Sequence, residues 1–400
     1  MESKINISIG GKWHFYDIVA AAYEMGLLKT FYTTIYFKNK ALVESAFGQR
    51  LNLGNRTCSY FPSFDVHSNF FPEMYPKVLR KMGLINDGQA LKMRCNLFDE
   101  WTEKVISPCR IFHSQDGFCL KTAKKMKENG STIIVDRGII SATYLKSLSE
   151  KEYAKYGIKK EYADCSIMDK CHQEHLLADY ILVPTNTVKK SLIAEGIESQ
   201  KIEIIPYGVD LNFFNLVDSV RTVSNVFRIL FVGEISFRKG CHYLLDAWNK
   251  IRLKNSELIL IGHIEKEFEV YLKNYTGKNF RIITYISQSK LKDYYKEASL
   301  FILPSLAEGS ARVIYEAMAC GLPVIYTEMS GSVARDGIDG FEISAYSVDA
   351  ICEKIIYMYY HRKQCIEMGE EGKSWIKNYS KENYRIRIQQ IYQKILSIKR

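Results

Sequence analysis

One segment, 304–340, limits what this 400-residue chain can fold into more than any other. The apolar run at 300–303 is typical of a buried strand, and Pro304 stops it because proline has no N–H to donate to a sheet. A helix is expected over 310–320, ended by Gly321, and a second strand at 323–326. The segment therefore predicts strand, loop, helix and strand in succession, which is the repeating unit of a parallel α/β sheet.

Two glutamates and a helix start suggest what this unit binds. The first N–H groups of a helix have no partner within it, so Gly309, Ser310 and Ala311 can offer theirs to a phosphate. Glu316 follows roughly 9 Å along the helix axis, about the span from a terminal phosphate to the ribose of a nucleoside diphosphate. Its carboxylate can accept both ribose hydroxyls, and Glu308 at the mouth can bind a sugar on the outer phosphate. The plainer alternative is an ordinary βαβ unit whose glutamates face water.

This spacing comes with a wider set of matching positions. They are Pro304-Ser305, Glu308-Gly309, Glu316-Ala317-Met318-Ala319, Gly321-x-Pro323-Val324-Ile325 and Gly331. Together they resemble the donor-binding signature of the retaining, nucleotide-sugar-dependent glycosyltransferases of family 4, which have the GT-B fold. The resemblance implies an α/β protein of two Rossmann-like, doubly wound domains that face each other across a cleft. It also implies metal-independent transfer of a hexose from a UDP- or GDP-linked donor, with no further cofactor, in the synthesis of bacterial surface polysaccharides such as lipopolysaccharide.

The length and the resemblance together suggest domain boundaries. Four hundred residues predict two domains. We expect an acceptor-side domain over 1–215, a polar linker at 216–227 and a nucleotide-sugar-binding domain over 228–380. In the family that the chain resembles, the last helix crosses back to the first domain, which is the expectation for 381–400. The contact would be an apolar stripe made of Tyr384, Ile388, Ile391, Tyr392, Ile395 and Leu396.

Candidate site residues of the first domain follow its strands. The resemblance places Gly10 and Gly11 opposite the donor diphosphate, where the lack of a Cβ allows close backbone approach. His113 ends an expected strand, where open α/β sheets bind ligands, so it is a candidate catalytic residue, although such a histidine is often structural. Relatives often carry a histidine two residues further on, where this chain has Gln115, which is a candidate contact for the acceptor or a phosphate. Arg137 is a candidate contact for phosphate or acceptor oxygens, and the alternative is an Asp–Arg pair that fixes the loop.

A glycine-bounded basic loop in the second domain is a further anion site. The loop begins at Gly233 and carries Arg238 and Lys239 just before a helix. By resemblance, Lys239 should pair with the donor diphosphate. The predicted catalytic group in this domain therefore consists of Lys239, Arg238 and Glu308.

Two details of this domain concern the donor. Relatives usually carry an arginine five residues before the lysine, but this chain has Glu234, and the sequence leaves open whether Arg238 compensates. By the same resemblance, Ile286 is expected to contact the nucleotide base.

The net charge of +10 indicates a negatively charged partner. The basic residues are spread along the chain with acids between them, which does not favour nucleic acid. A phosphate-rich substrate, or an anionic membrane that carries a lipid-linked acceptor, fits the charge equally well. Segment 74–84 mixes Lys77, Arg80 and Lys81 with apolar residues and could touch a membrane. The favoured interpretation is a helix with one buried apolar face and one solvated face.

Other patterns argue against metal, disulfides and a membrane span. The ten cysteines are scattered singly, as reduced thiols are. No Asp-x-Asp pair occurs, so we expect no metal. The first residues lack the apolar core of a signal peptide, and no apolar run is long enough to span a bilayer, so we expect a cytoplasmic protein. Peripheral contact with the cytoplasmic face of the membrane is a further expectation. The one cluster that resembles metal ligands, at an unusual zinc spacing, is Cys165, Cys171, His172 and His175.

Three functions remain in competition at this point. The favoured one is a glycosyltransferase that acts on a glycan or a lipid-linked saccharide acceptor. A glycoside hydrolase or phosphorylase needs two carboxyl groups that flank one bond, whereas Glu308 and Glu316 are spread along a diphosphate-length groove. A non-catalytic anion-binding protein would show clustered basic residues. The sugar, the nucleotide, the acceptor and the oligomeric state are not set by the sequence.

Overall fold

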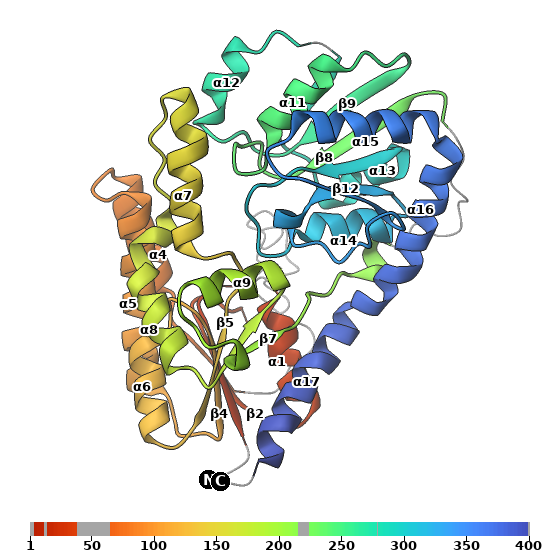
Figure 1. Ribbon diagram of the computed structural model, residues 1–400. Helices are drawn as coiled ribbons and strands as arrows, with labels where there is room; N and C mark the ends of the chain where they lie inside the picture. The colour runs from red at the N-terminus through yellow and green to blue at the C-terminus, as the bar shows by residue number, and fades with distance from the viewer. Residues whose placement is uncertain (1–3, 12–13, 38–64, 215–223, 278, 399–400) are drawn as a thin grey trace.

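The computed structural model describes residues 4–11, 14–37, 65–214, 224–277 and 279–398 (Figure 1). Each of its two α/β domains is built around one parallel sheet, as the sequence predicts. Most of the predicted linker, 216–223, lies outside the described residues, as do the chain ends 1–3 and 399–400.

In the described part of the first domain, seven strands form a parallel sheet. The strand order is β3-β2-β1-β4-β5-β6-β7, so the chain winds outward from β1 in both directions. The inner strands are buried on both faces, which fits the apolar run at 133–135 in one of them, whereas Ile5–Ile9 alternates apolar residues with the buried Asn6 and Ser8. The strands are β1 (Ile5–Ile9), β2 (Leu28–Thr33), β3 (Asp65–Ser68), β4 (Ile111–Gln115), β5 (Thr132–Asp136), β6 (Tyr180–Val183) and β7 (Ile202–Ile204).

Helices cover both faces of this sheet. Figure 1 shows α5, α6 and α8 on one side and α1 with the C-terminal helix on the other. The helices are α1 (Phe15–Glu24), α4 (Phe71–Lys81), α5 (Asp87–Val105), α6 (Leu120–Glu128), α7 (Ala142–Glu152), α8 (Met168–Leu177) and α9 (Asn186–Ala194). Short 3₁₀ helices are η2 (Tyr153–Tyr156), η3 (Ala163–Ile167) and η4 (Ser199–Lys201).

The second domain contains a parallel sheet of six strands in the order β10-β9-β8-β11-β12-β13. The unit predicted from segment 304–340 is confirmed as β11, α14 and β12, although the helix begins at Arg312, two residues later than expected. The strands are β8 (Phe227–Val232), β9 (Ser256–Ile261), β10 (Phe280–Ile283), β11 (Leu300–Leu303), β12 (Val324–Thr327) and β13 (Gly340–Ile343). The helices are α10 (Leu211–Phe214), α11 (Cys241–Lys250), α12 (Phe268–Asn274), α13 (Gln288–Glu297), α14 (Arg312–Ala319), α15 (Val348–Tyr360) and α16 (Arg362–Trp375), with η5 (Glu328–Ser330) and η6 (Ile376–Tyr379).

The last helix, α17 (Lys381–Ser397), returns to the first domain (Figure 1). All six residues of its predicted apolar stripe pack in the core formed by α1 and the first sheet. Arg385 adds ion pairs to Asp17 at 3.4 Å and to Glu24 at 2.9 Å, both on α1. The expectation of a returning helix is confirmed.

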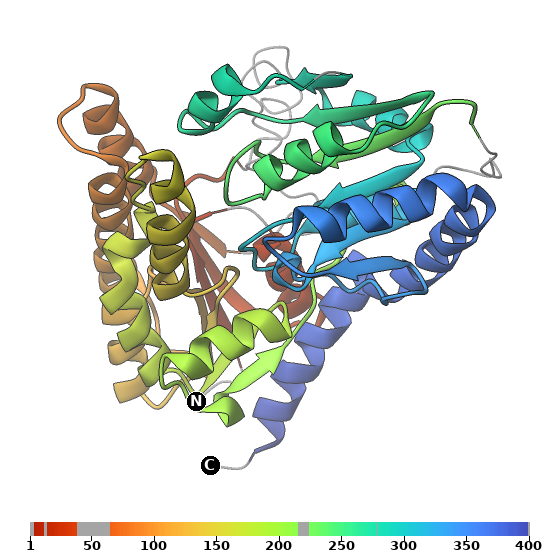
Figure 2. The same cartoon turned by 45° about the horizontal axis from the view of Figure 1, so that its top comes forward.

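A second connection between the domains comes from α7 and η2. The Tyr153 side chain is fully buried in the core of the second domain, and its hydroxyl lies 2.9 Å from a Glu265 oxygen. Glu152 accepts a hydrogen bond from the Tyr243 hydroxyl at 3.0 Å. Figure 2 shows α7 beside the second domain, so this charged segment is an interdomain contact.

The helix α4 departs from the favoured prediction. Its buried residues are Pro72, Glu73 and Pro76, whereas the apolar side chains of Phe71, Met74, Tyr75 and Val78 are exposed. The expectation of a buried apolar face is therefore wrong for this helix. No helix in the described part of the chain is both long and apolar enough to cross a membrane.

Candidate functional site

Three charged side chains of the second domain meet at the start of the predicted donor loop. The Glu308 carboxylate lies 2.8 Å from Arg238 Nη1 and 2.5 Å from Lys239 Nζ. Burial alone would raise the pKa of Glu308, but the two cations outweigh it and hold that pKa below its ordinary value. Glu308 therefore stays ionised at neutral pH and keeps both cations at one point of the cleft.

The backbone holds these cations in place. The loop between β8 and α11 ends at Gly240, whose φ of +68° favours glycine, and a Cβ there would lie 2.0 Å from the Pro304 carbonyl oxygen. Arg238 also donates from Nη1 to the Ala307 carbonyl at 2.9 Å, and its own carbonyl accepts from the Leu306 N–H at 2.8 Å. The basic loop and the donor loop therefore form one packed unit.

Glu234 occupies the position where relatives usually carry arginine. Its carboxylate lies 3.8 Å from Arg238 Nη2, and its side chain is 42% exposed. Arg238 therefore lies between Glu234 and Glu308. Gly233 precedes this group with a φ of +148°.

Glu316 lies on α14 and accepts a hydrogen bond from the Tyr295 hydroxyl at 3.1 Å. Burial raises the pKa of Glu316 to about 7, although Arg312 and the Tyr295 hydroxyl each lower it. Among the described residues, one hydroxyl donates to this carboxylate, so its oxygens can accept further hydrogen bonds, such as those from hydroxyl groups of a ligand. Glu308 precedes α14 and Glu316 lies within it, and the predicted span between them stays a prediction.

The three predicted phosphate-binding amides differ in availability. Among the described residues, the N–H groups of Gly309 and Ser310 have no hydrogen-bond partner. The Ala311 N–H instead donates to the Ser330 carbonyl at 3.1 Å, so the prediction that it is free for a phosphate is wrong. The helix begins later than expected, and Ala311 adopts an extended conformation in front of it.

Gly309 also joins the two domains. A Cβ at this residue would lie 1.8 Å from the Gly138 carbonyl oxygen in the first domain. The Thr185 hydroxyl, at the start of α9, donates to the Gly309 carbonyl at 2.8 Å. The donor loop therefore lies against the carboxyl ends of β5 and β6, where ligands bind in open parallel sheets.

The remaining candidates lie at the expected strand ends. The Gly10 carbonyl accepts hydrogen bonds from Thr34 and Arg94, and a Cβ on Gly10 would overlap the Phe118 ring. Around the Cα of Gly11 the described residues leave open space, which suits a ligand-facing loop. The Gln115 Oε1 atom at the end of β4 is buried and has no partner among the described residues.

Ile286 is half-buried at the edge of the second domain. It packs against the core of that domain, beside Tyr285, whose side chain is 86% exposed. Ser287 follows as the N-cap of α13. An apolar side chain and an exposed aromatic ring beside the sheet suit contact with a flat base.

His113 does not lie in the cleft. The strand β4 continues to Gln115, so His113 is an internal residue of the sheet and is fully buried. Its Nδ1 atom is 2.8 Å from the Tyr392 hydroxyl on α17, and burial lowers the pKa of His113 to about 4. The prediction of a catalytic role for His113 is wrong, because this side chain anchors the returning helix.

Arg137 is also structural. Its guanidinium donates to Asp116 at 2.7 Å and to the Ile139 and Ile140 carbonyls at 2.8 Å each. The side chain is buried, and each of its three nitrogens donates to a protein acceptor. The alternative of an Asp–Arg pair that fixes the loop is the better description, with Asp116 in place of Asp136.

The sequence interpretation missed His14. Its Nε2 atom lies 3.1 Å from Asp136 Oδ1, both side chains are buried, and its ring packs 4.1 Å from that of Tyr207. A Cβ on Gly138 would lie 3.9 Å from His14, which puts this pair beside the contact with Gly309. Local sequence gives no sign of it, since His14 and Asp136 are 122 residues apart.

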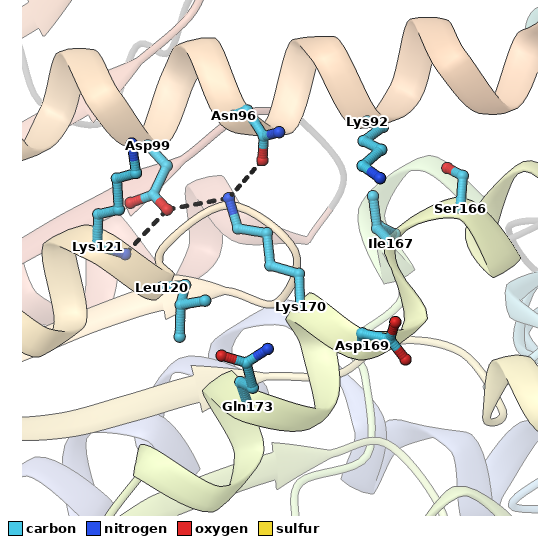
Figure 3. Close-up of a pocket in the computed structure, with 10 residues that line it drawn as sticks. All are labelled: Lys92, Asn96, Asp99, Leu120, Lys121, Ser166, Ile167, Asp169, Lys170 and Gln173. Atoms are coloured by element: carbon cyan, nitrogen blue, oxygen red, sulfur yellow. Dashed lines mark hydrogen bonds and ion pairs between the residues drawn. The ribbon is translucent and has the colours of Figure 1, made fainter.

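A separate hollow on the outer side of the first domain contains none of the predicted site residues. Figure 3 shows it between α5, α6 and α8, where Lys170 pairs with Asp99 at 2.9 Å. Asp99 also accepts from the Lys121 N–H, so it ties the three helices together. Within the described residues, no group of three or more histidine, cysteine, aspartate and glutamate side chains is arranged to hold a metal ion.

Residues 216–375 match the family model of glycosyl transferases group 1. A glycosyltransferase of Methanocaldococcus jannaschii, itself uncharacterized, is 27% identical over 42% of this chain and 48% of its own length. The amylovoran biosynthesis glycosyltransferase AmsK of Erwinia amylovora is 29% identical, over 55% and 54%. The UDP-Gal:alpha-D-GlcNAc-diphosphoundecaprenol alpha-1,3-galactosyltransferase of Escherichia coli is 26% identical, over 40% and 46%. The chain spans about half the length of the curated relatives it matches.

Two solved structures cover essentially the whole chain. A glycosyltransferase of Rickettsia africae has a TM-score of 0.64 at 14% identity, with both chains covered completely. Anabaena HepE, solved in complex with UDP-glucose, has a TM-score of 0.62 at 14% identity and covers 98% of this chain and 99% of its own. The chain thus has the GT-B fold, its second domain matches glycosyl transferases group 1, and the relatives, some of them in polysaccharide biosynthesis, support a glycosyltransferase.

Proposed function

We propose that the protein is a retaining, metal-independent glycosyltransferase that moves a hexose from a UDP- or GDP-linked donor to a glycan or lipid-linked saccharide in polysaccharide biosynthesis. The observation that carries the proposal is the pairing of Glu308 with Arg238 and Lys239 at one end of the donor loop and the under-satisfied Glu316 beyond it. A relative in amylovoran biosynthesis, AmsK, and the complex of HepE with UDP-glucose add support. We place the reaction in the cytoplasm.

The proposed chemistry is electrostatic. When the anomeric C–O bond breaks, negative charge builds on the departing diphosphate, and Lys239, Arg238 and the Gly309 and Ser310 amides can stabilise it. Before the donor binds, Glu308 balances the two cations. With the donor bound, the diphosphate shares these cations, and Glu308 can accept from sugar hydroxyls. Glu316 would accept from the ribose diol.

The ion pairs of two carboxylates support retention by same-side attack over a covalent intermediate. Glu308 is committed to two cations and Asp116 to Arg137, so neither is free to form a covalent intermediate with the sugar. Attack by the acceptor from the side of the leaving group then gives retention. The acceptor would enter from the first domain, beside Gly11 and Gln115.

One observation favours a second outcome, inversion. The His14–Asp136 pair has the arrangement in which a carboxylate orients a histidine that removes a proton. A base on the first domain could activate an acceptor hydroxyl for attack opposite the leaving group. The configuration of the product separates the two mechanisms, because inversion requires such a base and retention by same-side attack does not.

The experiment has two steps. A thermal-shift screen of the whole chain against UDP- and GDP-linked hexoses should identify one donor class that stabilises the protein, and UDP or GDP alone should compete with it. Proton NMR of the product formed from that donor then gives the anomeric configuration. If no nucleotide or nucleotide sugar stabilises the protein, the proposed function is contradicted. A product with inverted anomeric configuration would replace retention with the mechanism in which His14 acts as a base.

A further inference from the structure

The outer face of α4 is apolar and exposed. Phe71, Met74, Tyr75 and Val78 have exposed fractions of 42–49%, and Met82 just after the helix reaches 66%. The rings of Phe71 and Tyr75 stack at 5.0 Å, so the patch is contiguous along the helix. Exposed contiguous apolar surface on a soluble domain marks a contact site more often than scattered single residues do.

The helix α4 is amphipathic, but its apolar face is exposed, whereas a normal surface helix buries its apolar face. At 3.6 residues per turn, the exposed apolar residues share one face, and the buried Pro72, Glu73 and Pro76 occupy the other. The apolar stripe therefore points away from the first domain. Figures 1 and 2 show the α4–α5 turn projecting at the outer edge of that domain.

Basic residues border this stripe. Lys77 and Lys81 are exposed along one side of it, whereas Arg80, also exposed, lies on the opposite side of the helix and pairs with Asp87 at 2.6 Å. Apolar side chains in the middle and cations along the border complement an anionic lipid surface, where the cations meet headgroups and the apolar groups enter the acyl boundary. A protein partner would need no such general excess of positive charge.

The inner face of α4 connects to the cleft. The buried Glu73 carboxylate accepts from the Thr34 hydroxyl at 2.7 Å and lies 3.5 Å from an Arg94 nitrogen. Thr34 and Arg94 both donate to the Gly10 carbonyl, in the loop predicted to face the donor. The helix with the exposed stripe is therefore bonded directly to the first-domain side of the cleft.

We propose that the α4 surface, formed by Phe71, Met74, Tyr75, Val78 and Met82 with Lys77 and Lys81, docks on an anionic membrane. The docked helix would lie in the plane of the headgroups and bring the Gly10–Gly11 side of the cleft close to the lipid. Delivery of a lipid-linked acceptor to that side rests on the proposed function, whereas docking itself does not.

The test is co-sedimentation of the full chain with vesicles. Vesicles of phosphatidylcholine with phosphatidylglycerol should bind the protein, and vesicles of phosphatidylcholine alone should not. Lys77→Gln with Lys81→Gln should weaken partitioning about 30-fold, since each cation near an anionic surface contributes about a factor of five. Val78→Ser with Met82→Ser should weaken it at least about tenfold through the loss of apolar burial.

Matched controls separate the α4 surface from overall charge. Lys104→Gln with Lys124→Gln removes the same charge from exposed positions of α5 and α6 and should leave partitioning within about threefold of the wild type. Tyr360→Ser removes a ring that is 72% exposed in the second domain and should likewise change little. Because all these side chains are exposed, the variants should fold and bind UDP or GDP as the wild type does.

Several results would overturn the proposal. The first is that the wild type does not bind anionic vesicles. The second is that the α4 variants and the control variants lose vesicle binding equally. The third is that the protein does not bind vesicles but self-associates, and that the α4 variants abolish this self-association. Binding of UDP or GDP in the same samples is the independent readout of the proposed function. Its failure with vesicle binding intact would remove the transferase proposal and leave the docking surface standing.

Discussion

Replacing Glu316 with glutamine removes a charge that burial makes costly. Burial raises the pKa of this carboxyl to about 7 from an ordinary value of 4.5. Between these two pH values the folded protein binds more protons than the unfolded chain, so stability falls as pH rises through that window. At roughly 1.4 kcal/mol per pKa unit, the full cost at higher pH is about 3 kcal/mol.

Glu316→Gln should therefore stabilise the protein at pH 8.5 by up to about 3 kcal/mol and change its stability little at pH 4. Glutamine keeps an oxygen that can accept from the Tyr295 hydroxyl. The same change should weaken binding of UDP or GDP by about 10- to 150-fold, because a hydrogen bond to a charged group contributes roughly 1.5–3 kcal/mol. Urea unfolding followed by tryptophan fluorescence and calorimetric titration with UDP or GDP measure the two effects.

The exposed Glu297 at the end of α13 offers a matched control. Glu297→Gln should alter neither stability nor nucleotide binding. A Glu316 variant that binds nucleotide as tightly as the wild type would refute the ribose assignment. If Glu316→Gln does not raise the free energy of unfolding at pH 8.5, the buried Glu316 charge does not destabilise the fold as we infer.

Three further changes address the rest of the site. Lys239→Met should lower kcat about 10²- to 10³-fold, because it removes the charge that stabilises the leaving diphosphate. The control Lys250→Met, at the exposed end of α11, should leave kcat unchanged. Steady-state kinetics measures both, and an equal kcat in the two variants would contradict the proposed role of Lys239. His113→Leu should cost about 1–3 kcal/mol in urea unfolding and leave kcat unchanged, and a lost kcat would restore a catalytic His113. Because the folded-state pKa of about 4 lies below the ordinary 6.5, the wild type should lose stability as pH falls between those values, and this variant should lack that loss. Gly309→Ala should reduce kcat/KM and enlarge the radius of gyration in small-angle scattering, since the added Cβ would meet the Gly138 carbonyl; unchanged scattering would argue against this contact.

Sequence alone predicts the parts of the fold that local signals define. One unit is bounded by clear local signals, namely the apolar strand at 300–303, Pro304 after it and Gly321 at the end of the helix. The order of β11, α14 and β12 is therefore predictable from the sequence, with the start of the helix correct to within two residues. The apolar stripe on α17 also carries its own signal. The cluster of Glu308 with Arg238 and Lys239 required the family resemblance, because the residues lie about 70 positions apart.

The site residues that were predicted wrongly or overlooked make contacts with residues far away in the sequence, which no local pattern indicates. The strand that holds His113 continues two residues further than expected, and its partner Tyr392 is 279 residues away. His14 and Asp136 meet only because β1 and β5 end at the same edge of one sheet. The periodicity of α4 correctly indicates two faces, but it does not say which one is buried. The structure buries the face with Pro72, Glu73 and Pro76 because Glu73 bonds to Thr34 there.

The central claim is that the two domains hold a nucleoside diphosphate sugar between the cations paired with Glu308 and the Glu316 carboxylate. A crystal structure of the full chain with the donor selected by the thermal-shift screen tests it most directly. We predict that both ribose hydroxyls lie within hydrogen-bond distance of Glu316 and that the diphosphate contacts Lys239. A donor bound away from these two residues would contradict it.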